Sequence, residues 1–248
     1  MFYTPLSERS TTMSSVAERA NAHKVKLAAK QMPIRGYDFV PSMVDESEKE
    51  FIFRSLFPIG LDAFVQNPSE GMEKDIRDHL FSAEHLLVMR SDGTFKFGGN
   101  CEIGQPRPIA FRMWKNYNIN GKKALYLAGM CVSPSWQGRR IGQKMTEYAI
   151  EMEKPDYVFT VTQNPIAKLS MDKTLGKESF PKYEYERFDY TPFAEALGKK
   201  ADRYGKIAGN YGASLYGILP ISRDERYNEV FLRLNREAGD AYLCVSEL

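Results

Sequence analysis

Two strand-like segments joined by an Asn-Gly pair constrain the fold of this chain more than any other local feature. The apolar runs Ile109–Trp114 and Ala124–Val132 flank Asn120–Gly121. An Asn-Gly pair readily adopts the positive φ angles of a two-residue turn, and between two strand patterns it is the strongest short-range signal for a β-hairpin. The middle of the chain is therefore predicted to form an antiparallel sheet.

After Val132 the pattern changes to loop, helix, strand and helix. The predicted elements are a loop at 133–140, a helix at 141–153, a strand at 157–163 and a helix from 165 to about 175. Pro155 closes the first helix, whose predicted buried stripe consists of Ile141, Met145, Tyr148 and Met152. Antiparallel strands followed by a β-α-β-α run predict a mixed α/β sheet with helices on both faces.

The N-terminal part carries further strand and helix patterns. We expect a strand at 34–40, helices around 51–57 and 76–81, a strand at 85–89 and another strand that opens at Phe95. Residues 1–31 are rich in Ser, Thr, Ala and charge, and we expect a flexible N-terminal arm. A mitochondrial presequence is the alternative for this arm, but Glu8 and Glu18 count against it because presequences contain few acidic residues.

The C-terminal residues 177–248 are predicted to elaborate a core at 32–176. The segment Lys182–Phe193 interleaves aromatic with charged residues, which suits an edge strand or an aromatic loop equally. Its tyrosines either line an acceptor pocket or pack against the sheet. Three signals mark the end of the chain, namely a capping box at Ser222 and Glu225, a helix stop at Gly239 and a last strand at Ala241–Ser246. We expect this last strand to rejoin the core sheet.

Composition argues against several classes of partner. The 34 basic and 32 acidic side chains nearly cancel, so no overall field draws the molecule to nucleic acid or to an anionic membrane. No apolar run approaches the roughly 18 residues of a membrane helix, and the N-terminus lacks the apolar core of a secretory signal. The cysteines Cys101, Cys131 and Cys244 have neither disulfide-framework nor zinc-site spacing. We therefore expect a cytoplasmic protein with no metal, no nucleic acid and no membrane partner, and leave a homodimer open.

The segment Met130–Gln143 carries the clearest chemical pattern. An apolar strand end passes through a short loop into a helix, and this junction contains Gly138, Gly142 and the adjacent Arg139 and Arg140. The first N–H groups of a helix have no partner within it, and the helix dipole places positive charge beside them. Glycine lets a backbone approach a phosphate closely, and arginine matches phosphate oxygens. The pattern predicts a pyrophosphate site, with a simple chain connection as the alternative.

This segment resembles the acetyl-CoA loop of the GNAT superfamily of N-acetyltransferases. The family pattern, Gln/Arg-x-x-Gly-x-Gly/Ala after a Val-x-Pro strand end, reads here as Gln137–Gly142 after Val132–Pro134. Arg140 stands where the first motif glycine is expected, so this residue must adopt its backbone conformation with a side chain attached. The resemblance implies acetyl-CoA as co-substrate, with its pyrophosphate on the main-chain amides of Gly138–Gln143. The cofactor-binding residues that it implies are Met130, Cys131, Val132, Gln137, Gly138, Arg139, Arg140, Ile141, Gly142, Gln143 and Asn164.

The resemblance continues into the next helix. In the family an asparagine follows the next strand, and the helix after it carries a tyrosine close to the coenzyme sulfur. Asn164, Ala167 and Lys168 match this element, but Met171 stands at the tyrosine position. A thioether cannot protonate a departing thiolate, so a non-catalytic acyl-CoA sensor is the alternative to an enzyme. Trp136 in the loop is expected to fix the loop conformation rather than contact the adenine.

The resemblance also implies a fold and a reaction. The fold is a GNAT-like acyl-CoA N-acyltransferase fold with its sheet splayed near Ala128–Val132. The reaction is transfer of an acetyl group from acetyl-CoA to an amine acceptor by direct attack. Backbone groups at 130–132 would pair with the pantetheine arm, and the N–H of Met130 or Val132 would stabilise the oxyanion. The sequence does not identify the acceptor.

Three side chains are candidates for acid–base or covalent chemistry. Glu102 follows the strand that opens at Phe95, in the part of the sheet that faces the acceptor in the family, and a carboxylate there could take the amine proton directly or through water. His85 is either a base or a structural histidine. Cys131 lies on the same alternation as Leu127 and Gly129, which favours core packing over a nucleophilic role.

Overall fold

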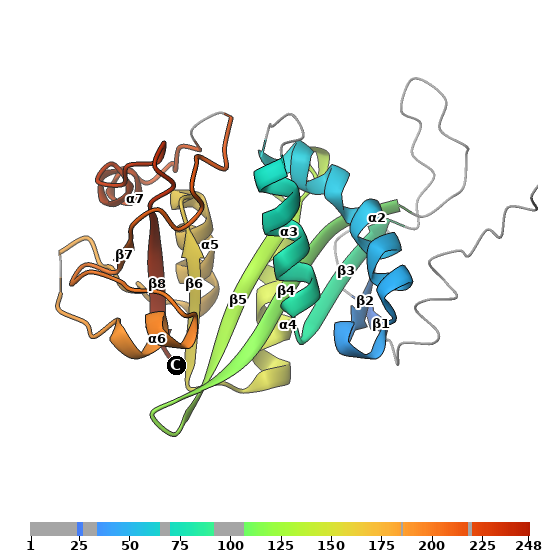
Figure 1. Ribbon diagram of the computed structural model, residues 1–248, viewed down its shortest axis with the longest axis horizontal. Helices are drawn as coiled ribbons and strands as arrows, with labels where there is room; N and C mark the ends of the chain where they lie inside the picture. Colours follow the sequence, from blue (N-terminus) through green and yellow to red (C-terminus); the bar gives the residue numbers. More distant parts are fainter. Residues whose placement is uncertain (1–23, 27–33, 65–69, 92–106, 185, 218–219) are drawn as a thin grey trace, which may run out of the picture.

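The protein is a mixed α/β molecule built around one central sheet (Figure 1). The computed structural model describes residues 24–26, 34–64, 70–91, 107–184, 186–217 and 220–248. Within these ranges the sheet has eight strands in the order β1-β2-β3-β4-β5-β6-β8-β7. The strands are β1 Lys24–Lys26, β2 Ile34–Phe39, β3 His85–Ser91, β4 Arg107–Ile119, β5 Lys122–Val132, β6 Tyr157–Thr162, β7 Lys206–Ile207 and β8 Ala241–Glu247. The mixed α/β class predicted from the sequence is confirmed.

The predicted hairpin forms the centre of the sheet. Strands β4 and β5 are antiparallel, and Asn120 and Gly121 connect them with φ angles of 53° and 80°. Positive φ at both turn residues matches the right-handed twist of the flanking strands. The Asn118 side chain accepts a 2.9 Å hydrogen bond from the Gly121 N–H, which closes the turn.

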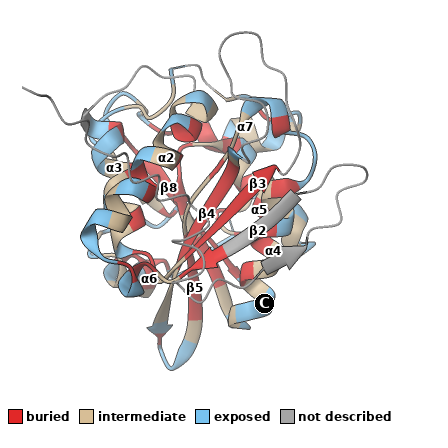
Figure 2. Ribbon diagram, turned by 90° about the vertical axis from the view of Figure 1, so that its right-hand side faces the viewer, coloured by how far each residue is buried: buried red, intermediate tan, exposed pale blue. Residues whose placement is uncertain are grey.

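Helices cover both faces of the sheet. One face carries α2 Glu46–Phe64, α3 Glu70–Ser82 and α6 Thr191–Ala196, and the other carries α4 Ile141–Glu153, α5 Pro165–Leu175 and α7 Glu225–Phe231. Two short 3-10 helices, η1 Pro41–Met43 and η2 Pro134–Trp136, precede α2 and α4. The strands between these layers are the most buried part of the molecule (Figure 2). No helix in the described ranges combines the length and apolarity needed to cross a lipid bilayer.

Strands β5 and β6 diverge after a short parallel contact. Their pairing covers only Ala124–Tyr126 against Tyr157–Phe159. Beyond it the Thr160 hydroxyl donates a 2.8 Å hydrogen bond to the Leu127 carbonyl, and no further main-chain pairs follow. Figure 1 shows the two strands meeting at their lower ends and separating toward the top of the molecule. The predicted splay near Ala128–Val132 is therefore confirmed.

A β-bulge at Ala128 accompanies the splay. Met113 pairs with Gly129 and Trp114 with Leu127, so Ala128 is an extra residue on β5. Leu127 consequently packs in the core under α4 and α5, whereas Cys131 packs in the core under α2 and α3. The predicted alternation from Leu127 through Gly129 to Cys131 is wrong, because an inserted residue moves every later side chain to the opposite face.

The C-terminal part departs from the sequence pattern in two places. The segment after Phe180 is an aromatic loop that leads into α6, not an edge strand. The predicted capping box is wrong, because Asp224 is the N-cap of α7 and accepts the Arg226 N–H, while Ser222 accepts the Asp224 N–H. The helix ends at Phe231, well before Gly239. Strand β8 then pairs with β6 and continues the sheet.

Candidate functional site

The edge of β5 that faces the splay presents free main-chain donors. The Ser133 N–H donates to the Ile109 carbonyl at 2.9 Å, which fixes the hydrogen-bonding phase between β4 and β5. In an antiparallel pair this phase directs the N–H groups of Met130 and Val132 away from β4 and toward the splay. In the described part of the chain, no group accepts a hydrogen bond from either N–H. The Val132 carbonyl accepts the Gln137 side-chain amide at 3.0 Å.

The start of α4 presents a second set of donors at the same end of β5. The helix follows η2 and a loop, and its N-cap residue Arg140 makes no side-chain capping bond. The Lys144 N–H donates to the Arg140 carbonyl at 3.0 Å, which is the first bond of the helix. Among the described residues, none accepts a hydrogen bond from the amides of Gly138, Arg140, Ile141, Gly142 and Gln143. Free amides at the positive end of a helix dipole are the arrangement that binds anions in proteins.

The backbone of this loop is shaped by two residues in the left-handed region. Gly138 has a φ of 74° and Arg140 a φ of 61°. Arg140 thus adopts the expected glycine-like conformation despite its side chain, and its Nε donates to the Gln143 side chain at 2.9 Å. The Arg139 guanidinium lies 4.8 Å from the centre of the Trp136 ring. Trp136 is only 4% exposed and packs in the core, as expected for a loop anchor.

Gly142 has a different role from the one its motif position suggests. A Cβ at this residue would lie 2.8 Å from the Met130 sulfur, on the side of the helix that packs on β5. Glycine here therefore allows the first turn of α4 to approach the strand. The close packing brings the free amides of the helix and those of β5 together at one end of the splay.

A single cleft joins these groups. Its volume is about 760 Å³, and it passes between β5 and β6 from one face of the sheet to the other. On the α4 and α5 side it is lined by Gln137, Gly138, the first residues of α4, Asn164 and Met171. On the α2 and α3 side its lining includes Phe64, Asp75, Ile76 and His79. The structure thus brings the predicted residues of β5, the loop and the start of α5 together around one cleft, with the exception of Arg139, which does not line it.

Arg112 on β4 is a site residue that the sequence analysis missed. Its side chain lines the cleft, is 5% exposed and donates to the Thr146 hydroxyl at 2.6 Å. Its Nε is buried without a hydrogen-bond partner among the described residues, and burial lowers the pKa of its guanidinium to about 10. The sequence feature that could have identified Arg112 is its position as a charged residue inside the apolar run 109–114. Arg112 is therefore a buried cation without a carboxylate partner among the described residues, and such a cation suits an anionic ligand.

The asparagine and methionine of the second motif occupy the cleft wall. Asn164 is the N-cap of α5, and its side-chain oxygen accepts the Ile166 N–H at 2.9 Å. Met171 is buried in the core beneath α5 and also lines the cleft. No hydroxyl replaces the missing tyrosine at this position of the helix.

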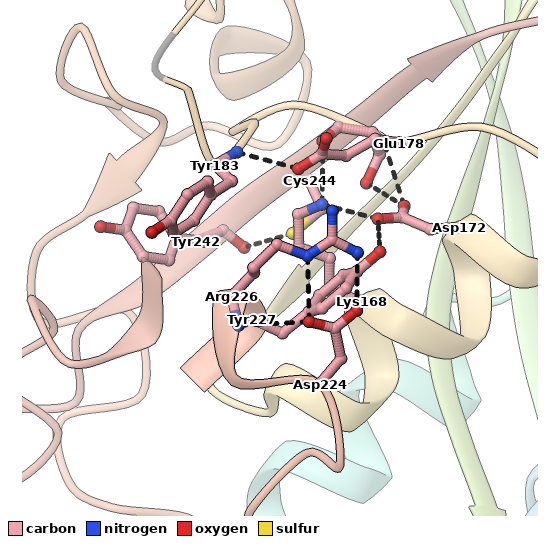
Figure 3. Close-up of polar contacts among 10 residues, drawn as sticks. Lys168, Asp172, Glu178, Tyr183, Asp224, Arg226, Tyr227, Tyr242 and Cys244 are labelled. Carbon is pink, nitrogen blue, oxygen red and sulfur yellow. Dashed lines mark hydrogen bonds and ion pairs between the residues drawn. The ribbon is translucent and has the colours of Figure 1, made fainter. Parts of the chain in front are cut away.

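Lys168, which also matches the second motif, has a structural role (Figure 3). Its ammonium is 2.7 Å from the Asp172 carboxylate and donates to the Ser179 carbonyl at 2.9 Å. Asp172 also accepts hydrogen bonds from Ser179 and from the Tyr227 hydroxyl. The groups that bond to Lys168 and Asp172 all belong to the protein itself. This cluster therefore attaches α5 to Ser179 and to Tyr227 of α7.

Two tyrosines from the C-terminal part enter the cleft and were not assigned to it from the sequence. The Tyr211 hydroxyl donates to the Val161 carbonyl at 2.9 Å. The Tyr216 ring packs edge-on against Phe64 at a centroid distance of 4.9 Å, and Tyr216 lines the cleft together with Asn164 and Thr162. Burial raises the pKa of the Tyr216 phenol well above its usual value, so it remains protonated at neutral pH.

The three remaining candidates for acid–base or covalent chemistry have different outcomes. Glu102 and the strand expected from Phe95 lie outside the described residues. His85 stacks on Trp114 at 5.0 Å and bonds to Asp38, so the structural alternative is the correct one. Cys131 lines the cleft, but burial raises its thiol pKa to about 12, which disfavours a thiolate nucleophile. Within the described residues, no three potential metal ligands converge.

Comparisons with known proteins give weak structural similarities. No family model and no curated protein matches the chain. The structure resembles a chain of the NatC complex bound to Gag peptide and CoA, with 15% identity, coverage of 88% of this chain and 99% of that chain, and a TM-score of 0.46. For a polyamine N-acetyltransferase from Drosophila melanogaster the identity is 12%, the coverages are 83% and 97%, and the TM-score is 0.40. For a glucosamine N-acetyltransferase region of a fungal multi-domain β-N-acetylglucosaminidase the identity is 19%, the similarity covers 55% of this chain and 14% of that chain, and the TM-score is 0.38.

Proposed function

We propose that this protein is an N-acetyltransferase that takes the acetyl group from acetyl-CoA and transfers it to an amine. The observation that carries the proposal is the set of free main-chain amides at Gly138 and at 140–143, residues that line the cleft between β5 and β6. Such amides at a helix start bind phosphate groups. The cleft continues from them along the free edge of β5, where an extended ligand with amide groups can pair as an added strand.

The charges around the cleft support an anionic ligand with a diphosphate. Arg112, Arg140, Lys173 and Arg223 all contribute to its lining. The pantetheine arm would run along Met130–Val132, and the diphosphate would lie on the loop and the start of α4. The residues present therefore fit coenzyme A in charge, hydrogen-bonding capacity and order along the cleft.

The same geometry supplies an oxyanion site. When a neutral amine attacks the thioester carbon, a C–N bond forms and negative charge develops on the carbonyl oxygen. A donor aimed at that oxygen in a site shielded from water can lower the barrier by about 3 kcal/mol. The N–H groups of Met130 and Val132 point into the cleft and are free to serve as this donor. Collapse of the intermediate breaks the C–S bond, and the departing sulfur takes up a proton.

The cofactor assignment is tested by thermal unfolding with CoA. At about 100 times its dissociation constant a ligand adds about 2.7 kcal/mol, which corresponds to a rise in Tm of roughly 5 to 11 °C for a chain of this size. We expect this rise in the wild type and its loss in Arg140→Glu, because a carboxylate there repels the diphosphate. Lys144→Glu is the matched control, since Lys144 is exposed on the same helix and does not line the cleft.

Two outcomes would contradict the cofactor assignment. One is a wild type whose Tm does not respond to millimolar CoA. The other is an Arg140→Glu variant that responds as fully as the wild type. Loss of the response in both Arg140→Glu and Lys144→Glu would indicate a general charge effect instead of binding at the loop.

A non-catalytic acyl-CoA sensor is the second candidate, and the buried Met171 is the observation that favours it. The two functions are separated by following thiol release from acetyl-CoA with a thiol reagent in the presence of a panel of amines. Amine-dependent release supports the enzyme. A CoA-dependent Tm rise without release on any amine supports the sensor.

A further inference from the structure

We propose that Asp75 and His79 of α3 form the acceptor subsite, in which they bind the ammonium group of the amine and receive its proton. This inference rests on the proposed function and assigns residues and an acceptor charge to it. Asp75 and His79 lie one helical turn apart, with 3.6 Å between the His79 Nε2 and the nearer Asp75 carboxylate oxygen. Both side chains line the cleft on the face of the sheet opposite α4.

The helix places this pair at the border between core and cleft. Met72, Ile76 and Leu80 form the buried stripe of α3 against the sheet. Asp75 and His79 occupy the positions beside this stripe, where residues three and four apart share one helix face. Their side chains are 27% and 25% exposed, so they are largely removed from water without being sealed in the core.

The two openings of the cleft are lined by residues of opposite charge. Its basic lining residues lie on β4 beneath α4, at the start of α4, on α5 and before α7. Asp75 is the one carboxylate that lines the cleft in the described part of the chain, and it lies at the α3 mouth. An anionic coenzyme on the α4 side and a cationic amine on the α3 side would thus each meet the complementary charge. The β5 amides that can hold the oxyanion lie between them.

Asp75 lacks the hydrogen bonds that a purely structural buried carboxylate requires. No described residue donates a hydrogen bond to its oxygens, apart from the longer contact with His79. Burial raises the pKa of the Asp75 carboxyl, and His79 and Lys199 oppose this rise. The Lys199 ammonium bonds instead to the Asn210 side chain. The titratable groups that face Asp75 are Lys74, Asp78 and His79 on its own helix, Lys199, Tyr126, Cys131 and Tyr211. An incoming ammonium would supply the missing donor.

The reaction requires a group that accepts the proton of the ammonium, and the pair of Asp75 and His79 can supply it. An ammonium must lose one proton before its nitrogen can attack the thioester carbon, and a base within hydrogen-bonding reach makes that transfer efficient. The His79 imidazole accepts the proton, and the Asp75 carboxylate stabilises the resulting charge. The net change is one ammonium and acetyl-CoA to one amide, CoA thiol and one released proton.

The subsite also predicts a charge preference. Phe64 and Tyr211 line the cleft, and the buried Tyr126 ring lies 6.4 Å from the His79 ring. A carboxylate close to the reacting nitrogen would be repelled by Asp75. The two lysines that face Asp75 in the described part of the chain already have partners, since Lys199 bonds to Asn210 and Lys74 pairs with Asp78. We therefore assign primary alkylammonium groups without an adjacent negative charge as the acceptor class.

Binding is tested by NMR of the full chain saturated with CoA, with n-butylammonium as the probe. The chain has three histidines, and the His79→Gln spectrum identifies the His79 ring signals. We expect n-butylammonium at millimolar concentration to move these signals in the wild type and in Asp78→Asn, but not in Asp75→Asn. Asp78 is the matched control because it lies on the same helix with a 62% exposed side chain.

Catalysis is tested in the same variants by CoA release. We expect Asp75→Asn to lower kcat/KM for n-butylamine about 100-fold and to change its pH profile, with the CoA-dependent rise in Tm retained. The wild type should prefer 4-aminobutanamide to 4-aminobutanoate, and this preference should disappear in Asp75→Asn. The retained response to CoA shows that the variant is folded.

The outcomes distinguish this inference from the proposed function. A wild type that does not bind CoA refutes the proposed function and the subsite with it. If CoA binds but n-butylammonium leaves the His79 signals unchanged, or moves them equally in Asp75→Asn, only the subsite is overturned. Equal kcat/KM values in the wild type and Asp75→Asn would also overturn it.

Discussion

At the scale of single residues, the cleft is defined by main-chain N–H groups that have no hydrogen-bond acceptor among the described residues and by a few side chains beside them. Met130 and Val132 contribute their N–H groups because the register with β4 turns them toward the splay. Gly142 lets the first turn of α4 pack close to Met130. Arg112 contributes a buried charge on the same side.

Tyr216 is the residue whose removal best tests the source of the final proton. Its phenol lies in the cleft beside Asn164 and stays protonated, whereas the helix position of Met171 offers no hydroxyl. We expect Tyr216→Phe to lower kcat for acetyl transfer by about 10 to 100-fold, since the ring packing on Phe64 remains and only the proton donor is lost.

The control for this prediction is Tyr157→Phe, which removes a hydroxyl at the far end of β6. Steady-state CoA release and the CoA-dependent Tm rise are measured for both variants. An unchanged kcat in Tyr216→Phe would show that the sulfur receives its proton from water or from another group.

At the scale of elements, a polar clamp holds β2, β3, β4 and α4 together at the end of the sheet away from the cleft. His85 Nδ1 is 3.3 Å from the Asp38 carboxylate, and its Nε2 is 3.4 Å from Glu153. Glu153 also accepts the Trp114 indole N–H at 3.0 Å and the Lys123 ammonium at 2.7 Å. The clamp fixes the C-terminal end of α4, while the N-terminal end of that helix lines the cleft.

The clamp should make stability depend on pH. The hydrogen bond with Asp38 raises the pKa of His85 in the folded state, with further support from Glu153 and Glu84 against desolvation. A raised folded-state pKa stabilises the protein fully below the unfolded pKa of about 6.5, and this contribution disappears as the pH rises through the folded value. We expect His85→Gln to be less stable than the wild type at pH 5.5, with the difference shrinking by pH 8.5.

Urea unfolding of the two proteins at these pH values measures the difference. His79→Gln is the control, because His79 lies in the cleft and outside the clamp. A stability difference between His85→Gln and the wild type that is equal at both pH values would mean that the charge of His85 does not contribute.

At the scale of the whole molecule, the C-terminal residues complete the site as well as the sheet. Strand β8 pairs with β6 over six residue pairs, and Tyr211 and Tyr216 enter the cleft from the chain before it. The Lys168–Asp172 cluster fastens this part to α5 (Figure 3). We propose that 32–176 and 177–248 fold as one cooperative unit, with the second part an elaboration of the first.

Lys168→Met tests this coupling. It leaves the Asp172 carboxylate buried without its cation, which typically costs about 3 to 5 kcal/mol of unfolding free energy. We expect this loss in urea unfolding followed by circular dichroism, with a single transition retained. Lys173→Met, an exposed lysine on the same helix, should stay within about 0.5 kcal/mol of the wild type. A loss below about 1 kcal/mol in Lys168→Met, or two separate transitions in the wild type, would contradict the proposal.

The sequence by itself determined the features that depend on neighbouring residues. Asn120–Gly121 fixed the central hairpin, and the change of pattern after Val132 marked α4 at Ile141–Glu153. The same local pattern located the free amides at the start of α4, because helix termini lack partners whatever surrounds them. The predicted stripe failed only at Met152, which is 38% exposed, since the end of α4 extends past the core.

The tertiary structure alone decided the features that depend on contacts between distant segments. The bulge at Ala128 arises from the pairing of β5 with β4, and it reversed the face that Cys131 occupies. Asp75 and Tyr216 lie far apart in the sequence but line the same cleft, and no local sequence pattern relates them. Local propensity and periodicity describe which groups a segment exposes, whereas burial and desolvation arise only when the folded chain brings separate segments together. The free amides at the start of α4 could therefore be predicted from the sequence, whereas the presence of Asp75 and Tyr216 in the same cleft could not.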